Sequence, residues 1–263
     1  MSGPRLPANL GNHRGYLREV RQYACGNGVR GDRNLIKDHF VYRVVRGAGD
    51  RNFTPEEAIK LLRAARLETD PLKRWGLFLM AYTGCRIGEL TGSAATAIQC
   101  REGVWCLVIQ DNIGDVNEPS TRFGNARIKV DESCKVAPLA AELLAEGFIE
   151  NYWEKLDKTG ALFTAVVPTE NGRDNARAKL ADWVWKTLGK TPKEEPKLSA
   201  NHSWRHTVET ALEKLEVSDG IAWRITGRAL TGSAANYRHT APATIKRHAD
   251  KITYKLYTDG LEG

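Results

Sequence analysis

Cysteine is scarce in this chain, and its placement argues against both a crosslinked fold and a zinc site. The cysteines are scattered, odd in number and without a C-x-x-C pair; the five are Cys25, Cys85, Cys100, Cys106 and Cys134. Disulfide frameworks and zinc sites both need paired or closely spaced thiols. We therefore expect reduced thiols in a cytoplasmic protein.

Long apolar runs are also missing. No stretch approaches the roughly 18 consecutive apolar residues of a membrane span. The first ten residues, MSGPRLPANL, contain no apolar core of a secretory signal. Hydrophobic residues nevertheless make up 41% of the chain and charged residues 27%, so a packed core is expected and a membrane partner is not.

Positive charge is unevenly distributed along the chain. Residues 1–52 contain ten Lys and Arg against four Asp and Glu, which gives +6 of the whole chain's net charge of +7. A basic arm ahead of a nearly neutral body suggests a polyanionic partner, most often nucleic acid. A soluble basic tail without a ligand explains the charge equally well, so composition leaves both interpretations open.

A domain boundary is expected near residue 50. The polar, glycine-containing segment 46–52 precedes a helix start with Thr54 as N-cap, Pro55 in the first helical position and Glu57 completing a capping box. Apolar residues then recur at i, i+3, i+4 and i+7, which predicts a helix over about 54–67. We predict a basic N-terminal segment at 1–50 and a larger domain at 51–263.

The rest of the chain predicts a mainly helical fold with one small sheet. Residues 103–110 are rich in β-branched and aromatic residues, and 126–130 and 135–139 suggest two more strands joined by the turn residues DES. Helical segments are expected at 71–84, 85–92, 139–156, 175–188, 203–215, 220–230 and 242–257. The predicted class is α+β, mainly α with a small three-stranded antiparallel β-sheet.

Three short segments contain candidate functional residues, and the first is TGCRIGEL (83–90). Arg86 and Glu89 are spaced i, i+3 and share one helix face. They form either a weak surface ion pair or, because a helix break at Thr83–Gly84 precedes them, a site where an arginine projects into a cleft.

The other two segments lie near the C-terminal end. In NHSWRHT (201–207), His202 and Arg205 project from the first turn of a helix, where free N–H groups attract anions. They form either a phosphate clamp or a basic helix start with a half-buried histidine. In ITGRALTGSAANYRH (225–239), Arg228 follows a helix break and Tyr237 lies among small residues that leave it accessible. A lone tyrosine is usually a packing residue.

Taken in order, these segments resemble the catalytic domain of the tyrosine recombinases, the phage integrase family. TGCRIGEL is similar to the family's first arginine box, HSWRHT to its H-x-x-R box, and ITGRALTGSAANYRH to its box ending in tyrosine. KVDESCKVAPL (129–139) keeps the family's spacing of lysine, serine, basic residue, proline and leucine on a β-hairpin, which points to Lys129. The similarity covers residues 52–257 and implies the DNA breaking–rejoining fold.

The resemblance implies six catalytic residues and two supporting ones. The catalytic residues are Arg86, Lys129, His202, Arg205, Arg228 and Tyr237, and the supporting residues are Glu89 and His206. Tyr237 is then the nucleophile and Lys129 the acid that protonates the leaving oxygen. His202 donates to the phosphate or relays a proton.

The two arginines suit a phosphate in the transition state. Arg86 and Arg205 have planar, permanently charged forks that match two phosphate oxygens. Donors placed in advance where charge develops can supply much of the rate. Glu89 is expected to orient Arg86 or His206, and the resemblance implies no metal ion or other cofactor.

The chain departs from the family in two places. Arg228 stands where the family usually has His or Trp; arginine can donate to a phosphate oxygen but cannot exchange protons near neutral pH. Segment 1–50 is shorter than the family's helical core-binding domain of roughly 100 residues. It is a remnant of that domain, a minimal version of it, or part of a longer one. Tyr254 and Tyr257 lie beyond the motif spacing and are expected to pack.

The predicted function is a site-specific DNA recombinase or integrase that cleaves and rejoins duplex DNA through a covalent 3′-phosphotyrosine. The resemblance implies a mobile element, in the cytoplasm of a bacterial, archaeal or virus-infected host cell. It also implies double-stranded DNA and a tetramer on DNA as partners, with accessory DNA-bending proteins as further candidates. The C-terminal helix either packs on a neighbouring protomer or caps its own core.

Two alternative functions stay open. One is a DNA-binding relative with impaired catalysis, and the other is a DNA-relaxing enzyme of the type IB topoisomerase kind. In the leading interpretation, Arg86→Ala and Arg205→Ala abolish cleavage and leave folding largely intact.

Overall fold

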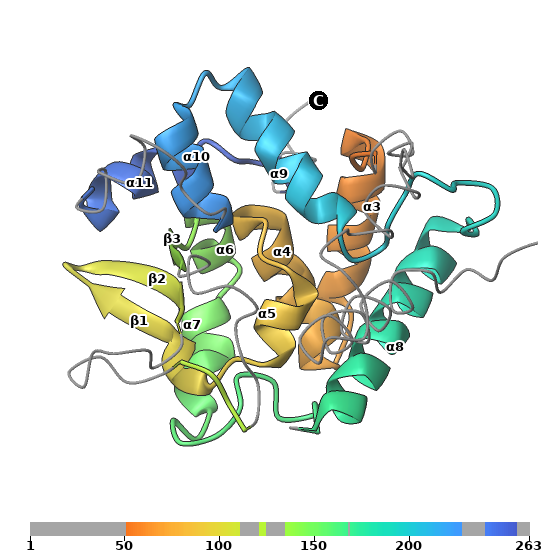
Figure 1. Cartoon of the computed structure of the whole chain (residues 1–263), viewed down its shortest axis with the longest axis horizontal. Coiled ribbons are helices and arrows are strands. Elements are labelled where there is room, and N and C mark those ends of the chain that lie inside the picture. The colour runs from red at the N-terminus through yellow and green to blue at the C-terminus, as the bar shows by residue number, and fades with distance from the viewer. Residues whose placement is uncertain (1–50, 111–120, 125–134, 168, 228–239, 257–263) are drawn as a thin grey trace, which may run out of the picture. The chain divides into compact units, whose positions relative to one another are not determined.

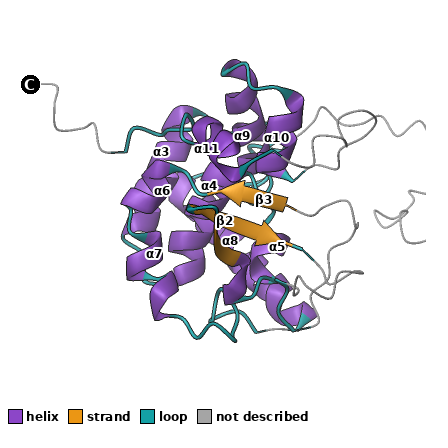
Figure 2. Ribbon diagram, turned by 90° about the vertical axis from the view of Figure 1, so that its left-hand side faces the viewer, coloured by secondary structure: helices purple, strands orange, loops and turns teal. Residues whose placement is uncertain are grey.

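The described residues form a mainly helical body with one small antiparallel sheet at its side (Figures 1 and 2). This computed structural model describes residues 51–110, 121–124, 135–167, 169–227 and 240–256. The predicted α+β class, mainly α with three antiparallel strands, is confirmed. The N-terminal segment 1–50 and the predicted strand 126–130 lie outside the described residues, so the domain boundary near residue 50 stays a prediction.

The helix predicted after residue 50 is α3, Pro55–Arg66. Thr54 Oγ1 accepts a hydrogen bond from the Glu57 N–H at 3.2 Å, and Glu57 Oε2 accepts one from the Thr54 N–H at 2.9 Å. This reciprocal pair is the predicted capping box, which satisfies two donors that a helix start leaves open. The predicted apolar stripe is buried and faces the core; it consists of Ala58, Leu61, Leu62 and Ala65.

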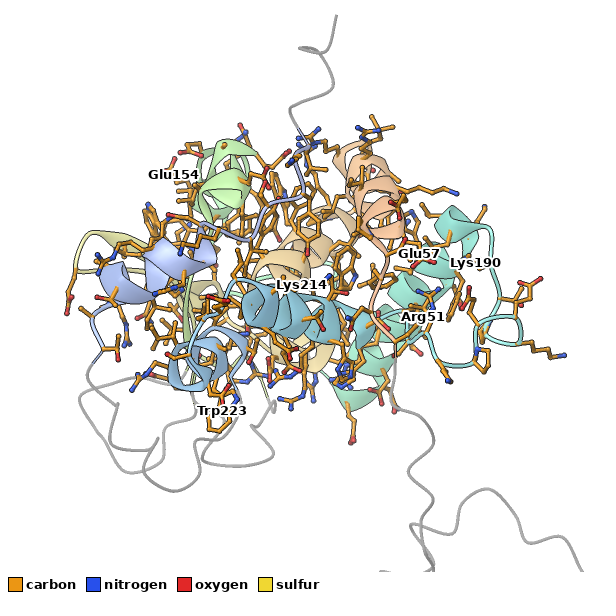
Figure 3. The ribbon with its side chains drawn as sticks, turned by 90° about the horizontal axis from the view of Figure 1, so that it is seen from above. Arg51, Glu57, Glu154, Lys190, Lys214 and Trp223 are labelled. Carbon is orange, nitrogen blue, oxygen red and sulfur yellow. The ribbon has the colours of Figure 1, made fainter. Side chains whose placement is uncertain are left out.

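Four charged side chains join the start of α3 to the loop after α8, Glu170–Leu188. Arg51 donates to Glu57 at 2.7 and 2.8 Å and to Glu195 at 3.0 Å. Lys190 bridges the same two carboxylates at 2.7 and 2.8 Å, and Figure 3 shows Arg51, Glu57 and Lys190 close together. The hydrogen bond from Arg51 is the main reason that the pKa of Glu57 falls to about 2. We call these four residues the ion network.

Helix α4, Leu77–Thr83, is the buried centre of the fold (Figure 1). It continues from a π-helical turn, Leu72–Gly76, and every one of its residues is buried. Its sequence LFLMAYT is apolar on nearly all sides, as expected for a helix surrounded by other elements. Each buried Leu or Phe side chain stabilises the fold by roughly 2 kcal/mol. Helices α3 and α9, Ser203–Lys214, pack against it.

The sheet has the order β1-β2-β3, with both neighbouring pairs antiparallel. Its strands are β1, Ile98–Arg101; β2, Val104–Ile109; and β3, Lys135–Pro138. The last two strands confirm predictions. The first was not predicted, because IQCR lacks a β-branched run. Its signal was the two-residue turn Glu102–Gly103, where φ is 51° and 76°, as in the hairpin turns that match strand twist.

The single helix predicted at 139–156 is wrong. Gly147, with φ of 81°, breaks it, because a left-handed residue cannot continue an α-helix. The segment instead forms three short pieces: α6, Ala141–Ala145; α7, Phe148–Asn151; and a 3₁₀ turn, Trp153–Lys155. The apolar residues therefore lie in helical pieces as their spacing predicts, but Gly147 divides the segment.

The helix predicted at 242–257 is also shorter in the structure. It is α11, Pro242–Ala249, and the chain continues without helix to residue 256. Tyr254 lies in that extension, and its hydroxyl donates to the Ala81 carbonyl of α4 at 2.9 Å. This contact confirms that Tyr254 packs on the core, whereas Tyr257 lies outside the described residues.

Candidate active site

Two helix ends meet where the sequence motifs converge. Helix α4 ends at Gly84, with φ of 60°, and α10, Asp219–Thr226, ends at Gly227, with φ of 69°. A Cβ atom on Gly84 would lie 3.2 Å from Thr226 Cγ2 and 3.3 Å from Val208 of α9. Three predicted motif segments are therefore in contact. We call this region the helix-end junction; it comprises Thr83, Gly84, Lys135, Arg205, Thr226 and Gly227.

Arg205 is buried in the junction and binds both helix ends. It is 3% exposed. Its Nη1 donates to the Thr226 carbonyl and, at 3.4 Å, to the Gly84 carbonyl. Its Nε lies 3.2 Å from Glu209 Oε1, one helical turn away. A cation is favourable there because helix C-termini carry partial negative charge and unsatisfied carbonyls.

Lys135 is a second buried cation in the junction. It is 2% exposed, and its Nζ donates to the Thr83 carbonyl at 3.0 Å. A Cβ atom on Gly227 would lie 2.9 Å from Lys135 Cδ, so the lysine stem runs against the end of α10. Burial lowers the pKa of Lys135 because desolvation disfavours the ammonium. The sequence pattern contained Lys135 only as the basic residue between Lys129 and the proline.

Arg86 is the exposed arginine of the predicted set. It is the N-cap of α5, Ile87–Thr91, two residues after Gly84, and its side chain is 45% exposed. Glu89 accepts from the Arg86 N–H at 2.8 Å and from its Nη1 at 2.9 Å. Glu89 thus contacts both the backbone and the guanidinium of Arg86, which is the arrangement predicted for an orienting carboxylate. The guanidinium lies at the surface, where a ligand can reach it.

The two histidines lie together on the first turns of α9. His202 is its N-cap, and the rings of His202 and His206 stand edge to face with centroids 5.1 Å apart. Glu209 lies 3.9 Å from His206 Nδ1 and also contacts Arg205. Sequence reasoning missed Glu209, although its i, i+4 spacing from Arg205 was a usable signal.

Two further arginines that the sequence did not single out surround α5. Arg122 donates to the Glu89 carbonyl at 2.7 Å and to the Gly88 carbonyl at 3.3 Å. Arg177 of α8 donates to the Thr91 hydroxyl at 3.3 Å, and its guanidinium lies beside Gly88. Their distance in sequence from the first arginine box left no local signal for either contact.

Three predicted site residues lie outside the described residues: Lys129, Arg228 and Tyr237. The described residue before Arg228 is Gly227, which belongs to the junction. The described strand after Lys129 begins with Lys135, which belongs to it too. The structure therefore brings Arg205 into contact with Gly84 and Thr226, and Arg86 follows two residues after Gly84. The catalytic and supporting roles of the whole predicted set stay predictions.

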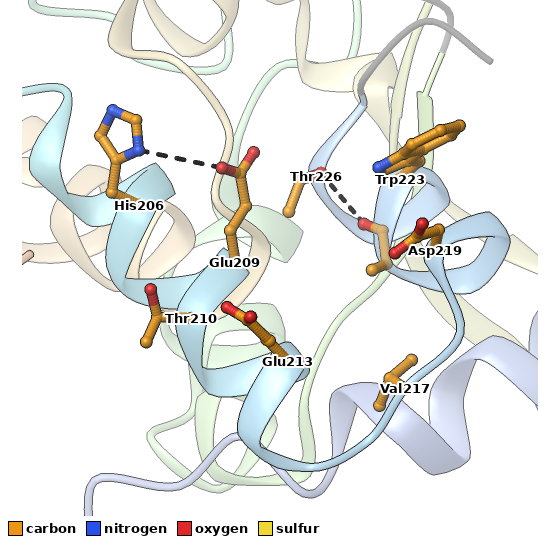
Figure 4. Close-up of a pocket in the computed structure, with 9 residues that line it drawn as sticks. His206, Glu209, Thr210, Glu213, Val217, Asp219, Trp223 and Thr226 are labelled. Carbon is orange, nitrogen blue, oxygen red and sulfur yellow. Dashed lines mark hydrogen bonds and ion pairs between the residues drawn. The ribbon is translucent and has the colours of Figure 1, made fainter. Parts of the chain in front are cut away.

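A cavity of about 400 Å³ opens between α9 and α10 (Figure 4). Its lining includes the carboxylates of Glu209, Glu213 and Asp219, together with His206 and Trp223. Three carboxylates repel a phosphate, so this cavity is not a candidate phosphate site. Within the described ranges, this cavity included, no group of three His, Cys, Asp or Glu side chains could hold a metal ion. No helix within those ranges is long and apolar enough to span a membrane.

The junction and Arg86 together hold more positive than negative side chains. Arg86 pairs with Glu89, Arg205 pairs with Glu209, and Lys135 adds a third cation, while His206 lies 3.9 Å from Glu209. Such an excess in a partly buried setting favours an anion. The arrangement can bind and polarise a phosphate that approaches the exposed guanidinium of Arg86.

Comparison with known proteins gives a partial likeness to a solved structure. No protein-family model matches the chain, and no curated protein matches it. Among solved structures the chain is similar to XerA recombinase, with 19% sequence identity and a TM-score of 0.48. The match covers 76% of this chain and 62% of that protein, so the chain spans less than two thirds of the recombinase.

Proposed function

We propose that this protein is a site-specific DNA recombinase that cleaves and rejoins duplex DNA through a covalent 3′-phosphotyrosine on Tyr237. One observation carries the proposal. Arg205 of the H-x-x-R box binds the carbonyls of Gly84 and Thr226, which belong to the two other boxes named from sequence. Motifs separated by more than a hundred residues thus meet at one buried cation.

The proposed chemistry uses the surplus positive charge around that point. The guanidiniums of Arg86 and Arg205 stabilise the charge that builds on the non-bridging phosphate oxygens. Glu89 holds Arg86 in place through the 2.9 Å contact. His202, on the first turn of α9, donates to the phosphate or moves a proton, with His206 in support.

The bond changes involve the residues outside the described ranges. The phenol of Tyr237 passes its proton to His202 as its oxygen attacks phosphorus, and the bond from phosphorus to the 5′ oxygen breaks. Lys129 gives that oxygen its proton, so the products are a phosphotyrosine and a free 5′ hydroxyl. Arg228 donates to a non-bridging oxygen. Attack by a 5′ hydroxyl of another strand reverses the step and completes strand exchange within a tetramer on double-stranded DNA, with accessory DNA-bending proteins as further candidates.

Adduct formation with DNA tests the proposal directly. The protein is incubated with a pool of random-sequence duplexes that carry a nick, so that the fragment released by cleavage diffuses away and the adduct accumulates. After denaturation, mass spectrometry examines the tryptic peptide 229–238, ALTGSAANYR, in which Tyr237 is the single tyrosine. The proposal expects a nucleotide on this peptide, absent in Tyr237→Phe and reduced about a thousandfold in Arg86→Ala.

The same assay separates the two alternatives. DNA binding by the parent protein without any adduct would identify a non-catalytic DNA-binding relative, which the Arg228 departure motivates. An adduct accompanied by relaxation of supercoiled plasmid, without exchanged strands, would identify a relaxing enzyme instead. Tyr254→Phe is the matched control, since that hydroxyl is bonded to Ala81 in the core. It should leave adduct formation unchanged.

A further inference from the structure

Lys135 is an unusual residue for a protein core. An ammonium that is 2% exposed has lost nearly all its water, which is unfavourable unless a partner replaces that hydration. The Lys135 ammonium donates to the carbonyl of Thr83, the last residue of α4, at 3.0 Å. A buried cation directed at a helix C-terminus recovers part of the loss through the helix dipole. The stabilisation of the buried Lys135 ammonium therefore depends on the turn at the end of α4.

That turn carries Arg86. Thr83 Oγ1 accepts from the Cys85 N–H at 3.3 Å, so the turn is also closed by its own hydrogen bond. Lys135 holds the Thr83 carbonyl, and Arg205 holds the next one, at Gly84. Two buried cations on different elements thus fix consecutive carbonyls, and the chain reaches Arg86 two residues later.

The stem of Lys135 fixes the second helix end as well. Its Cδ, Cβ and Cγ lie 2.9, 3.2 and 3.4 Å from where a Cβ atom on Gly227 would be. β3 is thereby packed directly on the C-terminus of α10, which precedes Arg228. One side chain consequently links β3, the turn before Arg86 and the end of α10.

We propose that Lys135 is a positioning residue that holds the Thr83–Cys85 turn, and through it the guanidinium of Arg86, in the orientation that binds the phosphate. Its effect on catalysis rests on the proposed function, whereas its effect on the turn does not. Lys135 acts through Arg86, because its ammonium is bonded to a backbone carbonyl and shielded from solvent. If the turn is already ordered before DNA binds, phosphate binding does not have to offset the entropy that would be lost in ordering Arg86.

The first test compares three variants in the adduct assay. Lys135→Met removes the ammonium and keeps an unbranched stem, Lys135→Arg restores a donor and a charge, and Lys155→Met alters an exposed lysine. Lys135→Met should slow adduct formation at least about tenfold at saturating DNA, with DNA affinity within about threefold of the parent. Lys135→Arg should recover part of the rate, and Lys155→Met should match the parent.

The second test needs no enzymatic activity. Cys85 lies in the turn and is 1% exposed, and Cys106 on β2 is fully buried; they fall in separate tryptic peptides, 75–86 and 102–122. Thiol alkylation of the native protein, followed by peptide mass spectrometry, measures the opening of each site. Lys135→Met should speed labelling of Cys85 at least about tenfold and leave Cys106 within about twofold. A purely global loss of stability would raise both rates alike.

The outcomes separate the two hypotheses. Selective exposure of Cys85 in a parent protein that forms no adduct would sink the proposed function and keep the role of Lys135 in the turn. Unchanged Cys85 labelling in Lys135→Met, or equal acceleration at both cysteines, overturns the positioning role. So does a Lys135→Met variant that forms the adduct at the parent rate. Should Lys135→Met fail to fold, Lys135→Arg is labelled in its place, and parent-like protection of Cys85 is then required.

Discussion

The ion network and the helix-end junction are both clusters of charged side chains, but they are built differently. In the ion network, two cations pair with two carboxylates, and Arg51 and Lys190 each contact both Glu57 and Glu195. In the junction, Lys135 and Arg205 donate to backbone carbonyls at helix ends, and Arg205 also pairs with Glu209. The first cluster is neutral, and the second keeps an excess of positive charge.

That difference separates a structural cluster from one that can bind a ligand. A balanced network of partly exposed charges satisfies itself and contributes modestly to stability. Carbonyl partners satisfy the hydrogen-bonding groups of a cation without cancelling its charge. The junction can therefore be well packed and still attract an anion, and its buried members are expected to matter more for folding than the network does.

The largest expected effect tests this point at Arg205. Arg205→Ala leaves the Gly84 and Thr226 carbonyls without their cation and should lower the free energy of unfolding by about 3 kcal/mol. This replaces the expectation from sequence that the variant folds normally, because the structure buries the guanidinium. Urea denaturation measures it. The matched change in the ion network, Arg51→Ala, should cost about 1 kcal/mol because Lys190 still holds both carboxylates. Equal losses of stability in the two variants would contradict the proposed difference between the junction and the ion network.

The next effect is the acid sensitivity of the ion network. The pKa of Glu57 is about 2 in the folded protein against an ordinary value of 4.5. Because the folded pKa is depressed, the stabilisation is complete above about pH 4.5 and declines as the pH falls toward about 2. Allowing for solvent around Arg51 and Lys190, we expect a loss of about 2 kcal/mol over that window. In Glu57→Gln, the free energy of unfolding should change less with pH over this window. If it changes as steeply as in the parent protein, other groups cause the acid sensitivity.

Two left-handed glycines provide a smaller, matched comparison. Gly227 in the junction and Gly189 at the end of α8 have φ of 69° and 70°, but only Gly227 has a neighbour within 4 Å of its missing Cβ. Gly189→Ala should cost about 1 kcal/mol for the backbone alone, and Gly227→Ala about 2 kcal/mol. In a Lys135→Ala background, which removes the Cδ contact at 2.9 Å and keeps the Cβ, the extra loss at Gly227 should shrink, as a double-mutant cycle would show. Additive effects would mean that the lysine stem adapts freely.

The smallest effect on stability is expected at Arg86. Its pair with Glu89 is exposed, so Arg86→Ala should change the free energy of unfolding by less than about 1 kcal/mol. The same variant should nearly abolish adduct formation, so Arg86 is expected to affect the chemistry alone, whereas Arg205 is expected to affect both the chemistry and the stability. A thermal melt beside the adduct assay checks both. A melt as depressed as that of Arg205→Ala would place Arg86 among the structural cations.

The sequence predicted most of what local chemistry decides. The capping box at Thr54, the break at Gly84 and the helix that begins after His202 all follow from spacing and turn residues. The break at Gly147 was available from the same chemistry but was outweighed by the apolar pattern around it. The sequence did not predict strand β1, because two-residue hairpin turns usually contain Asn-Gly or Asp-Gly, whereas this turn is Glu-Gly.

The junction could be predicted only in part. The motif resemblance predicted that Arg86 and Arg205 belong to one site. It could not predict that Arg205 is buried, because its burial depends on the carbonyls that it contacts in the folded chain. Spacing along a strand does not say which lysine faces a helix end, so the sequence pattern contained no signal for the burial of Lys135, and Lys129 stays a prediction. Arg122 and Arg177 carried no local signal at all. Contacts between distant segments, not residue types, decide these positions.

The junction also has a consequence for the order in which the molecule assembles. Arg205 reaches Gly84 across 121 residues of chain, and Lys135 reaches Thr83 across 52. Contacts this far apart form late, after local helices and turns. A ribosome releases the turn before Arg86 long before it releases the arginine that steadies it. A half-made chain is therefore expected to lack the finished turn, and replacing either buried cation should hasten unfolding more than it delays refolding.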